Sequence, residues 1–459
     1  MTRLLRKPAE HPVTPGRPAW PLVLTLAWPA LLQNWLSLAV MFTDRLLAGR
    51  FQDLDAADQT ATQAAQTTAN YLAWVLLSYT TLVTIGATAL VARLVGGGDL
   101  PGARRVLHQA LVLAVVLGVV GTAAGLALLP PALGLLQLGE PASSYAADYL
   151  RPLLYALPLQ MAGAAGVACL AGAGDTRAGL WVLGGVTLLN VPMAWGFFFL
   201  RGFAGIAVGT AVSQALGGVV VLLVLCRGRA GLRLSLEELR PDRNLLRRLL
   251  HVSVPAAIDS LSMQAGYLCF LGIVNRLGHT AAAAHGVALM WEALGYQSGA
   301  AFGTAALTVV GQHLGAGQPR RAARGGWTAF GLGAAAMSLM GLVFFSLARP
   351  MFALFNPHPG QGAIIEAGVP ALRLIAFAMP ALAACMILAK ALQGAGDTRG
   401  PMLFTWVGFF GVRIPLAYWL TAGGWGLVGA WLAMAADLHV RGLCVLLRFA
   451  RGRWKSTRV

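Results

Sequence analysis

The chain alternates long apolar runs with short polar connections. Each run is about 20 residues or longer, the length that an α-helix needs to cross the hydrocarbon core of a bilayer. The runs lie at 21–49, 65–95, 104–130, 145–172, 178–200, 204–226, 247–275, 282–314, 322–348, 362–393, 400–421 and 425–449. This pattern predicts an all-α polytopic membrane protein with about twelve transmembrane helices.

Composition supports a membrane protein and argues against a disulfide framework or a zinc site. Of the 459 residues, 57% are hydrophobic and 11% are charged, whereas a soluble domain is about a quarter charged. The five cysteines are scattered, mostly within the apolar runs, and none forms a CxxC pair. We therefore expect no metal site and no cofactor.

The net charge of +17 is distributed unevenly along the chain. Most of the 34 Lys and Arg residues fall in the first 20 residues, in 227–246, in 441–459 and in the short connections on the same predicted side. The intervening connections are acidic or neutral, with Asp53 and Glu140 as examples. This asymmetry sets orientation in membranes. It predicts a multi-pass protein of the cell's inner (plasma) membrane with both termini in the cytoplasm, and it gives no reason to expect a nucleic-acid partner.

The two halves of the sequence repeat one another. GAGDTR at 172–177 occurs again at 394–399, and Pro29 in the first run has a counterpart in Pro255 of the seventh. Because six spans is an even number, both halves enter the membrane from the same side and are parallel repeats. The predicted parts are a tail (1–20), an N-lobe (21–226), a linker (227–246), a C-lobe (247–449) and a second tail (450–459).

The GAGDTR segment has the residue types of a tight turn between helices. Gly172 and Gly174 can end a helix in the left-handed conformation. Asp175 or Thr176 can cap the helix that follows. We interpret the segment as a cytoplasmic turn that is diagnostic of architecture, in preference to a substrate site.

Few ionisable residues lie well inside the predicted spans, namely Asp44, Asp259, Glu292, Asp437, Lys390, Arg373 and Arg413. An ionisable side chain at membrane depth is costly and is a functional-site hypothesis by default. Asp44 follows Pro29 in the first run and is the leading candidate for binding a coupling cation; the alternative is an interfacial acid that ends the span. Asp437, with His439 and Arg441 nearby, is expected to anchor the inner surface.

Several motifs resemble the multidrug and toxic compound extrusion (MATE) antiporters of the prokaryotic type. They are the duplicated GAGDTR, the segment 281–322, RIPLAYWL at 413–420 and RGRWK at 451–455. The resemblance covers essentially the whole chain. It implies two six-helix lobes, arranged in a V, that open a central cavity alternately to either side. It also implies that inward flow of protons or sodium ions drives the export of drugs.

The resemblance also bears on the cation site. Asp44 resembles the family's first-helix acid, and Asn190 matches an Asn of the fifth span, but Ala194 stands where relatives often have Asp. With one carboxylate, and with Asn190 and Asn34 as neutral ligands, we favour a proton over sodium, because a desolvated carboxyl needs no further ligand to carry a proton. Asn34 has a helix-packing amide as its alternative reading.

The second half offers two further acids, Asp259 and Glu292. Some relatives carry a Glu in the seventh span, but Met263 occupies about that position here. We expect Asp259 or Glu292 to be a second proton site or a counter-charge for cationic drugs. The alternative is a structural pair with Lys390 or Arg413, since buried charges are normally paired.

A set of aromatic and Met residues could line a cavity for flat, cationic, lipophilic compounds. Helix packing or contact with lipid is the default interpretation of each residue taken singly. The members of the set are Met41, Tyr71, Trp74, Met263, Tyr267, Met290, Trp291 and Tyr296. Pro29 and Pro255 each remove a backbone hydrogen bond and predict bends in their helices.

The function indicated is that of a monomeric secondary transporter that exchanges small amphipathic drugs or toxic metabolites for protons or sodium. An enzyme is disfavoured because no Walker A, HExxH or GxSxG motif occurs. A lipid-linked precursor flippase, with Arg373, Lys390 and Arg413 as its candidate cations, and a major-facilitator carrier are the alternatives. The major-facilitator alternative is weakened because this chain lacks that family's basic signature in the connection after the second run.

Overall fold

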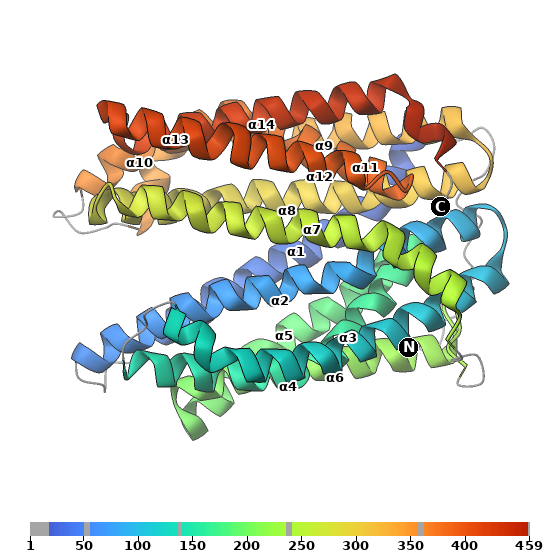
Figure 1. Ribbon diagram of the computed structural model, residues 1–459, viewed down its shortest axis with the longest axis horizontal. Coiled ribbons are helices and arrows are strands. Elements are labelled where there is room, and N and C mark those ends of the chain that lie inside the picture. The colour runs from blue at the N-terminus through green and yellow to red at the C-terminus, as the bar shows by residue number, and fades with distance from the viewer. Residues whose placement is uncertain (1–17, 50–55, 136–139, 236–240, 356–361, 458–459) are drawn as a thin grey trace. The chain divides into compact units, whose positions relative to one another are not determined.

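The computed structural model describes residues 18–49, 56–135, 140–235, 241–355 and 362–457. Side chains at 40–49, at 56–68 and at several positions up to 77 are outside this description. The regular elements that the structure describes are helices, without a strand among them (Figure 1).

The helices follow one another along the chain with short connections. The first six are α1 (Ala19–Gly49), α2 (Ala56–Gly96), α3 (Leu100–Leu135), α4 (Ala142–Gly172), α5 (Thr176–Arg201) and α6 (Phe203–Arg227). The next four are α7 (Arg243–Asn275), α8 (His279–Gly315), α9 (Pro319–Phe355) and α10 (Gly362–Ala383). The last are α11 (Ala389–Gly394), α12 (Arg399–Trp406), α13 (Ile414–Leu420), α14 (Gly426–Arg451) and a 3₁₀ turn, Arg453–Ser456.

Ten described helical segments are long and apolar enough to cross a membrane. One of them, 399–451, contains both of the last two predicted spans. The predicted span 282–314 coincides with α8, which is outside the ten and carries His285, Glu292 and Gln312 along its length. The prediction of an all-α, multi-pass membrane protein is confirmed.

The chain divides into two compact units. Unit 1 contains Leu32–Ser253, and unit 2 contains Val254–Val459 together with the part of α1 that ends at Leu31. These units differ from the predicted lobes because the start of α1 is assigned to the second unit. The physical reason is packing, since Val23, Leu26 and Ala27 belong to the same buried apolar cluster as Phe270 and Val274 of α7.

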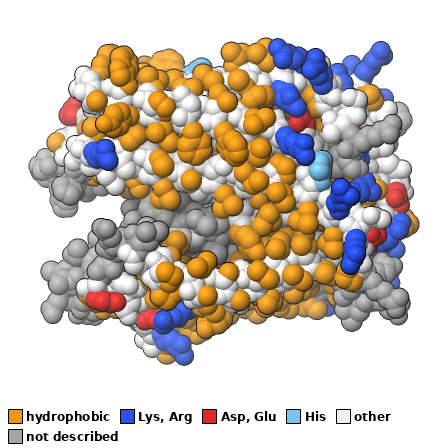
Figure 2. Space-filling model, in the orientation of Figure 1, with side chains coloured by type: hydrophobic (Ala, Val, Ile, Leu, Met, Phe, Trp, Pro, Cys, Tyr) orange, Lys and Arg blue, Asp and Glu red, His pale blue; other side chains and the backbone are white. Residues whose placement is uncertain are grey.

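Each unit has its own apolar core. In unit 1, Tyr149 of α4 packs on Phe203 of α6 with ring centroids 5.4 Å apart. In unit 2, α8, α9, α10 and α14 bury a larger cluster that includes Phe344, Phe352 and Trp431. The outward faces of the helices are also apolar, and Figure 2 shows hydrophobic side chains along much of the visible surface of unit 2. Leu403, Val407 and Leu443 are examples of exposed apolar residues in unit 2, as expected for helices that contact lipid.

The duplicated GAGDTR turns have the same structure in both units. Gly174 and Gly396 have φ of 92° and 89°, a conformation that favours glycine. Asp175 Oδ1 accepts a hydrogen bond from Ala178 N, and Asp397 Oδ1 accepts one from Gly400 N. The predicted cap is therefore Asp175, not Thr176.

The first glycine of each turn has a different role from the one predicted. Gly172 and Gly394 are the last residues of their helices and do not adopt the left-handed conformation. A Cβ at Gly172 would lie 2.6 Å from Thr88 O of α2, and one at Gly394 would lie 2.3 Å from Leu307 O of α8. These glycines are required for close helix–helix contact, which spacing in the sequence could not distinguish from a helix cap.

Candidate functional site

The leading candidate, Asp44, lies in α1, but its side chain is outside the described residues. The same holds for Met41, Tyr71 and Trp74 of the predicted cavity. Asn34 is half-buried in α1 and interacts with another group of the chain. The roles of these residues stay predictions.

Asn190 lies at the centre of a buried polar cluster between α5 and α6. Its Nδ2 donates hydrogen bonds to Thr210 Oγ1 at 3.1 Å and to Ser213 Oγ at 3.0 Å. Its Oδ1 is buried and has no hydrogen-bond partner among the described atoms. A buried amide oxygen without a partner is costly, so the cluster presents an acceptor that a cation or a protonated group could satisfy.

Ala194, at the position where some relatives carry an acid, lies in a close helix crossing. Ala194 is fully buried, and α6 crosses it at Gly209, where a Cβ would lie 2.6 Å from Ala194 Cα. The described members of the polar cluster at Asn190 are an amide and two hydroxyls, without a carboxylate.

Unit 2 contains a fully buried ionic cluster. Asp437 of α14 has no exposed surface and accepts hydrogen bonds from Arg413 Nε at 2.8 Å and from Arg441 Nε at 2.7 Å. Arg441 Nη2 donates a further bond to Asp437 Oδ2. The prediction that Asp437 anchors the inner surface is wrong, because two buried arginines bind it inside the unit.

The ring of Phe409 is part of the same cluster. It lies 4.0 Å from the guanidinium carbon of Arg413 and 5.0 Å from that of Arg441. Phe409 belongs to the π-helical segment Val407–Arg413, which also positions Arg413. Gly408 of this segment approaches α14 so closely that a Cβ there would lie 2.1 Å from Asp437 Oδ1. The irregular helix thus allows α14 and the arginine to meet.

Two further acids of unit 2, Asp259 and Glu292, have no arginine bound to them in the described contacts. Asp259 of α7 interacts electrostatically with Lys390 of α11 without a described ion pair, and its Oδ1 is buried with no hydrogen-bond partner among the described atoms. Glu292 of α8 is 8% exposed and is near enough to Arg413 and Arg441 to interact with both. One predicted alternative is a structural ion pair between Glu292 and Arg413. In the described contacts Arg413 instead binds Asp437.

The aromatic and Met candidates of unit 2 divide between packing and open positions. Tyr267 packs edge-on against Phe409 with centroids 5.1 Å apart, and Trp291 packs against Phe355. Met263 and Met290 are half-buried, whereas Tyr296 is 37% exposed. Tyr296 therefore has the most accessible ring of this set.

Thr210 and Ser213 are not predicted from the sequence, and Arg441 is noted there only as a neighbour of Asp437. The spacing of Asp437 and Arg441, one helical turn apart, is a signal that could have identified their ion pair. Thr210 and Ser213 are ordinary hydroxyl residues in an apolar helix, and only the crossing of α5 and α6 brings them to Asn190.

The two prolines lie where the chain passes between the compact units. The boundary in α1 follows Leu31, two residues after Pro29, and the boundary in α7 lies between Ser253 and Val254, just before Pro255. Both prolines are inside continuous helices. The chain thus passes between the two units twice, each time within a helix that contains a proline.

The chain matches the family model named MatE twice, over residues 29–196 and 255–419. The two matched segments correspond to the two halves of the internal repeat. Each contains one of the prolines and one of the GAGDTR turns.

Curated relatives are similar over nearly the whole chain. The probable multidrug resistance protein NorM of Thermotoga maritima is 27% identical over 95% of this chain and 93% of its own length. The multidrug resistance protein PmpM of Pseudomonas aeruginosa is 27% identical over 94% of this chain and 91% of its own.

Solved structures show the same fold. A MOP superfamily transporter from Pyrococcus furiosus aligns over 99% of this chain and 100% of its own, with a TM-score of 0.89 and 18% sequence identity. At that identity the similarity concerns the fold.

Proposed function

Because this chain belongs to the MatE family of membrane transporters, we propose that it exports amphipathic, cationic compounds or toxic metabolites in exchange for a cation. We propose protons as the coupling ion, with sodium as the alternative. The multidrug resistance relatives NorM and PmpM, similar over nearly their whole lengths, support this class of substrate.

The observation that carries the proposal in unit 2 is the distribution of its buried charges. Arg413 and Arg441 both bind Asp437, so Asp259 and Glu292 are the acids of this unit's spans without a bound arginine in the described contacts. A carboxyl that is desolvated and not held by an ion pair can gain and lose a proton as its surroundings change. It can equally face the positive charge of a lipophilic drug.

The polar cluster of unit 1 supports protons over sodium. Sodium requires several oxygen ligands around a fixed charge, and at Asn190 the described donors are neutral. Position 194, one helical turn from Asn190, is a buried alanine and supplies no carboxylate. Asp44 would then be the charged group of this unit, with Asn190 and Asn34 near it as neutral ligands.

In the proposed cycle, Asp44 takes up a proton from outside, α1 rearranges at Pro29 and the drug leaves outward. The units then rearrange so that the transport pathway opens to the cytoplasm, and Asp44 releases its proton there. A transmembrane potential supplies about 2.3 kcal/mol per charge per 100 mV, and one pH unit supplies about 1.4 kcal/mol. The proposed setting is the inner membrane, with both termini cytoplasmic and the protein a monomer.

The flippase alternative has less support from unit 2. A pyrophosphate group would need free cations, but Arg413 binds Asp437. Arg373 is exposed on its helix and its guanidinium lies 5.5 Å from the ring of Phe345. Lys390 remains, with Asp259 as its electrostatic partner.

Transport assays in proteoliposomes test the proposal. We expect efflux of a flat cationic dye under an imposed pH gradient and weaker efflux under a sodium gradient. Asp44→Asn and Glu292→Gln should each reduce proton-driven efflux to the level of empty vesicles, because each removes a titratable group. Glu366→Gln serves as the control, since Glu366 pairs with Arg349 at an exposed position.

Unaltered dye export by Asp44→Asn, with normal expression, would remove that residue from the mechanism. Flipping of a lipid-linked substrate without dye efflux would favour the flippase instead.

A further inference from the structure

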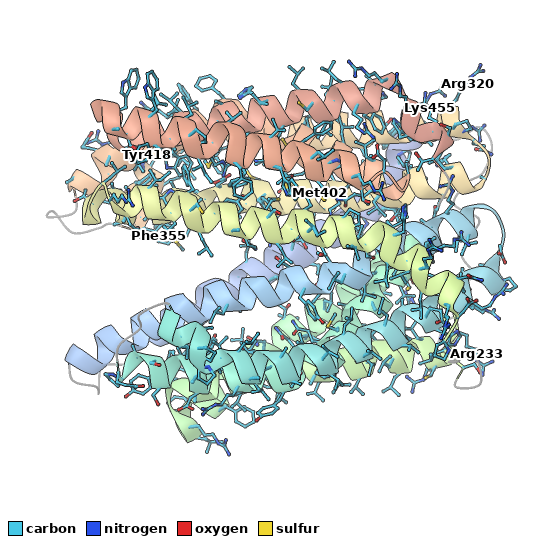
Figure 3. The ribbon with its side chains drawn as sticks, in the orientation of Figure 1. Arg233, Arg320, Phe355, Met402, Tyr418 and Lys455 are labelled. Carbon is cyan, nitrogen blue, oxygen red and sulfur yellow. The ribbon has the colours of Figure 1, made fainter. Side chains whose placement is uncertain are left out.

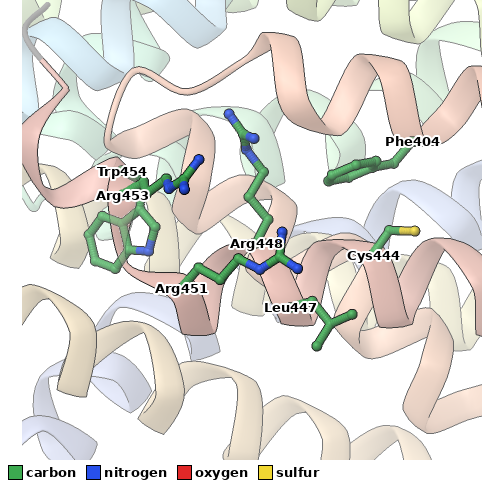
Figure 4. Close-up of a pocket in the computed structure, with 7 residues that line it drawn as sticks. All are labelled: Phe404, Cys444, Leu447, Arg448, Arg451, Arg453 and Trp454. Atoms are coloured by element: carbon green, nitrogen blue, oxygen red, sulfur yellow. The ribbon is translucent and has the colours of Figure 1, made fainter.

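A basic pocket lies in unit 2 at the end of α14. It has a volume of about 270 Å³ and is lined by Phe404, Cys444, Leu447, Arg448, Arg451, Arg453 and Trp454 (Figure 4). The proposed transport cycle uses none of these residues.

The pocket holds positive charge that no described acid neutralises. Arg448 binds Asp397, with Arg448 Nε 2.6 Å from Asp397 Oδ2. Arg451 and Arg453 are exposed and have no ion pair with an acid in the described part of the chain. Two guanidinium groups are therefore available to an anion, and planar guanidinium groups bind phosphate well.

The rest of the pocket is apolar. Phe404 of α12 faces Cys444 and Leu447 of α14 across the pocket (Figure 4). Further exposed apolar side chains lie nearby in the sequence: Leu403 of α12, Val407 of the π-helical segment that follows it and Leu443 of α14 are 51%, 54% and 57% exposed. A free phosphate would gain nothing from this apolar surface, whereas an acyl chain would.

The cationic end of the pocket is held in place. Trp454 is 1% exposed, its ring stacks on Phe449 with centroids 4.7 Å apart, and its Nε1 donates to Phe449 O at 2.8 Å. Gly452, with φ of 70°, makes the turn between Arg451 and Arg453. Anchoring of the turn reduces the entropy lost when a ligand binds the two arginines.

The pocket lies at the basic end of unit 2. Figure 3 shows Lys455 and Arg320 at this end and Tyr418 and Phe355 at the other. By the distribution of Lys and Arg, the basic end faces the cytoplasm, where the membrane surface is anionic and basic pockets between transmembrane helices bind lipid headgroups.

We propose that this pocket binds an anionic phospholipid of the cytoplasmic leaflet, with its phosphate between Arg451 and Arg453 and an acyl chain along Phe404, Leu447 and Leu443.

Native mass spectrometry of the full chain, released from nanodiscs of equal phosphatidylglycerol and phosphatidylcholine, tests the proposal. We expect retained phosphatidylglycerol on the unaltered protein and about thirtyfold weaker retention in the double variant Arg451→Gln/Arg453→Gln, from the usual contribution of a cationic side chain near an anionic surface. Arg320→Gln/Arg324→Gln is the matched control, because it removes the same charge from exposed positions of unit 2.

A second variant tests the apolar part of the pocket. Leu447→Asn should weaken retention of phosphatidylglycerol while both arginines are present, and inorganic phosphate should not displace the lipid. Equal losses in the Arg451/Arg453 and Arg320/Arg324 variants would overturn the proposal, since they would show diffuse attraction to charge. Equal retention of phosphatidylcholine and phosphatidylglycerol would overturn it as well.

Discussion

At the scale of single residues, the Arg413–Asp437–Arg441 cluster is the most demanding feature of unit 2. A buried ion pair is stabilising only where its geometry and hydrogen bonding offset the cost of desolvation. Here Asp437 accepts bonds on both carboxylate oxygens, and Phe409 lies against both guanidinium groups. Arg413 Nη1 has no partner among the described atoms, so the cluster is satisfied in part and carries net positive charge.

The cluster predicts a large effect from removal of its one acid. Asp437→Asn should destabilise the protein by about 3–5 kcal/mol, because it removes the acid that both buried cations bind and leaves them only the electrostatic interaction with Glu292. Thermal unfolding in detergent measures this effect. Glu366→Gln, at an exposed ion pair, should cost about 0–1 kcal/mol.

Addition of Arg413→Gln to Asp437→Asn should recover part of the loss, since one of the two unpaired charges is removed. If the double variant is as unstable as the sum of the single variants, the ionic account of the cluster is wrong.

At the scale of elements, the two GAGDTR turns connect helices in the same way within each unit. In each turn the aspartate caps the helix that follows and also binds an arginine. Asp175 binds Arg229, just after α6, and Asp397 binds Arg448, near the end of α14. The turns after α2 and α8 also match, with φ of 79° at Gly98 and 69° at Gly317. The internal repeat thus extends from sequence to backbone conformation and ion pairing.

Substitution of Gly394, the first glycine of the second GAGDTR turn, tests the close contact between helices directly. Gly394→Ala should destabilise unit 2 by about 1–3 kcal/mol, the usual cost of overpacking, because the new Cβ would lie 2.3 Å from Leu307 O. Gly331→Ala is the control, since nothing lies within 4 Å of its Cβ position, and it should be neutral or stabilising by about 0.5–1 kcal/mol. Equal melting temperatures for the two variants would refute the contact.

At the scale of the whole molecule, α1 and α7 are the helices that belong to both compact units. Each crosses from one unit to the other within two residues of its proline. A proline removes one hydrogen bond from the helix and concentrates bending there. A change in which side of the membrane the transport pathway opens to would therefore bend α1 at Pro29 and α7 at Pro255.

Replacement of the prolines should affect transport more than binding. Pro29→Ala and Pro255→Ala restore the missing hydrogen bonds, so we expect a several-fold lower maximal rate of dye efflux with an unchanged dye dissociation constant. Pro370→Ala is the control, because Pro370 is an exposed residue of α10 within unit 2. Unchanged efflux rates in both proline variants would exclude these positions as hinges.

The sequence by itself determined the membrane fold, the internal repeat and the family. Apolar runs and the asymmetry of Lys and Arg depend on the cost of moving each side chain into lipid, which is a local property of the sequence. The sequence also limited the cap to Asp175 or Thr176 and the left-handed residue to Gly172 or Gly174, because a turn's conformation depends on adjacent residues.

The tertiary structure alone decided which buried charges are free to act. Whether Arg413 pairs with Glu292 or Asp437 depends on which helices approach, and that is set by Gly408 and an irregular helical segment with no distinct sequence signal. The same holds for Asn190, whose partners Thr210 and Ser213 meet it only through the crossing of α5 and α6. Side-chain pairing between distant helices is a property of packing, and hydrophobic pattern does not encode it.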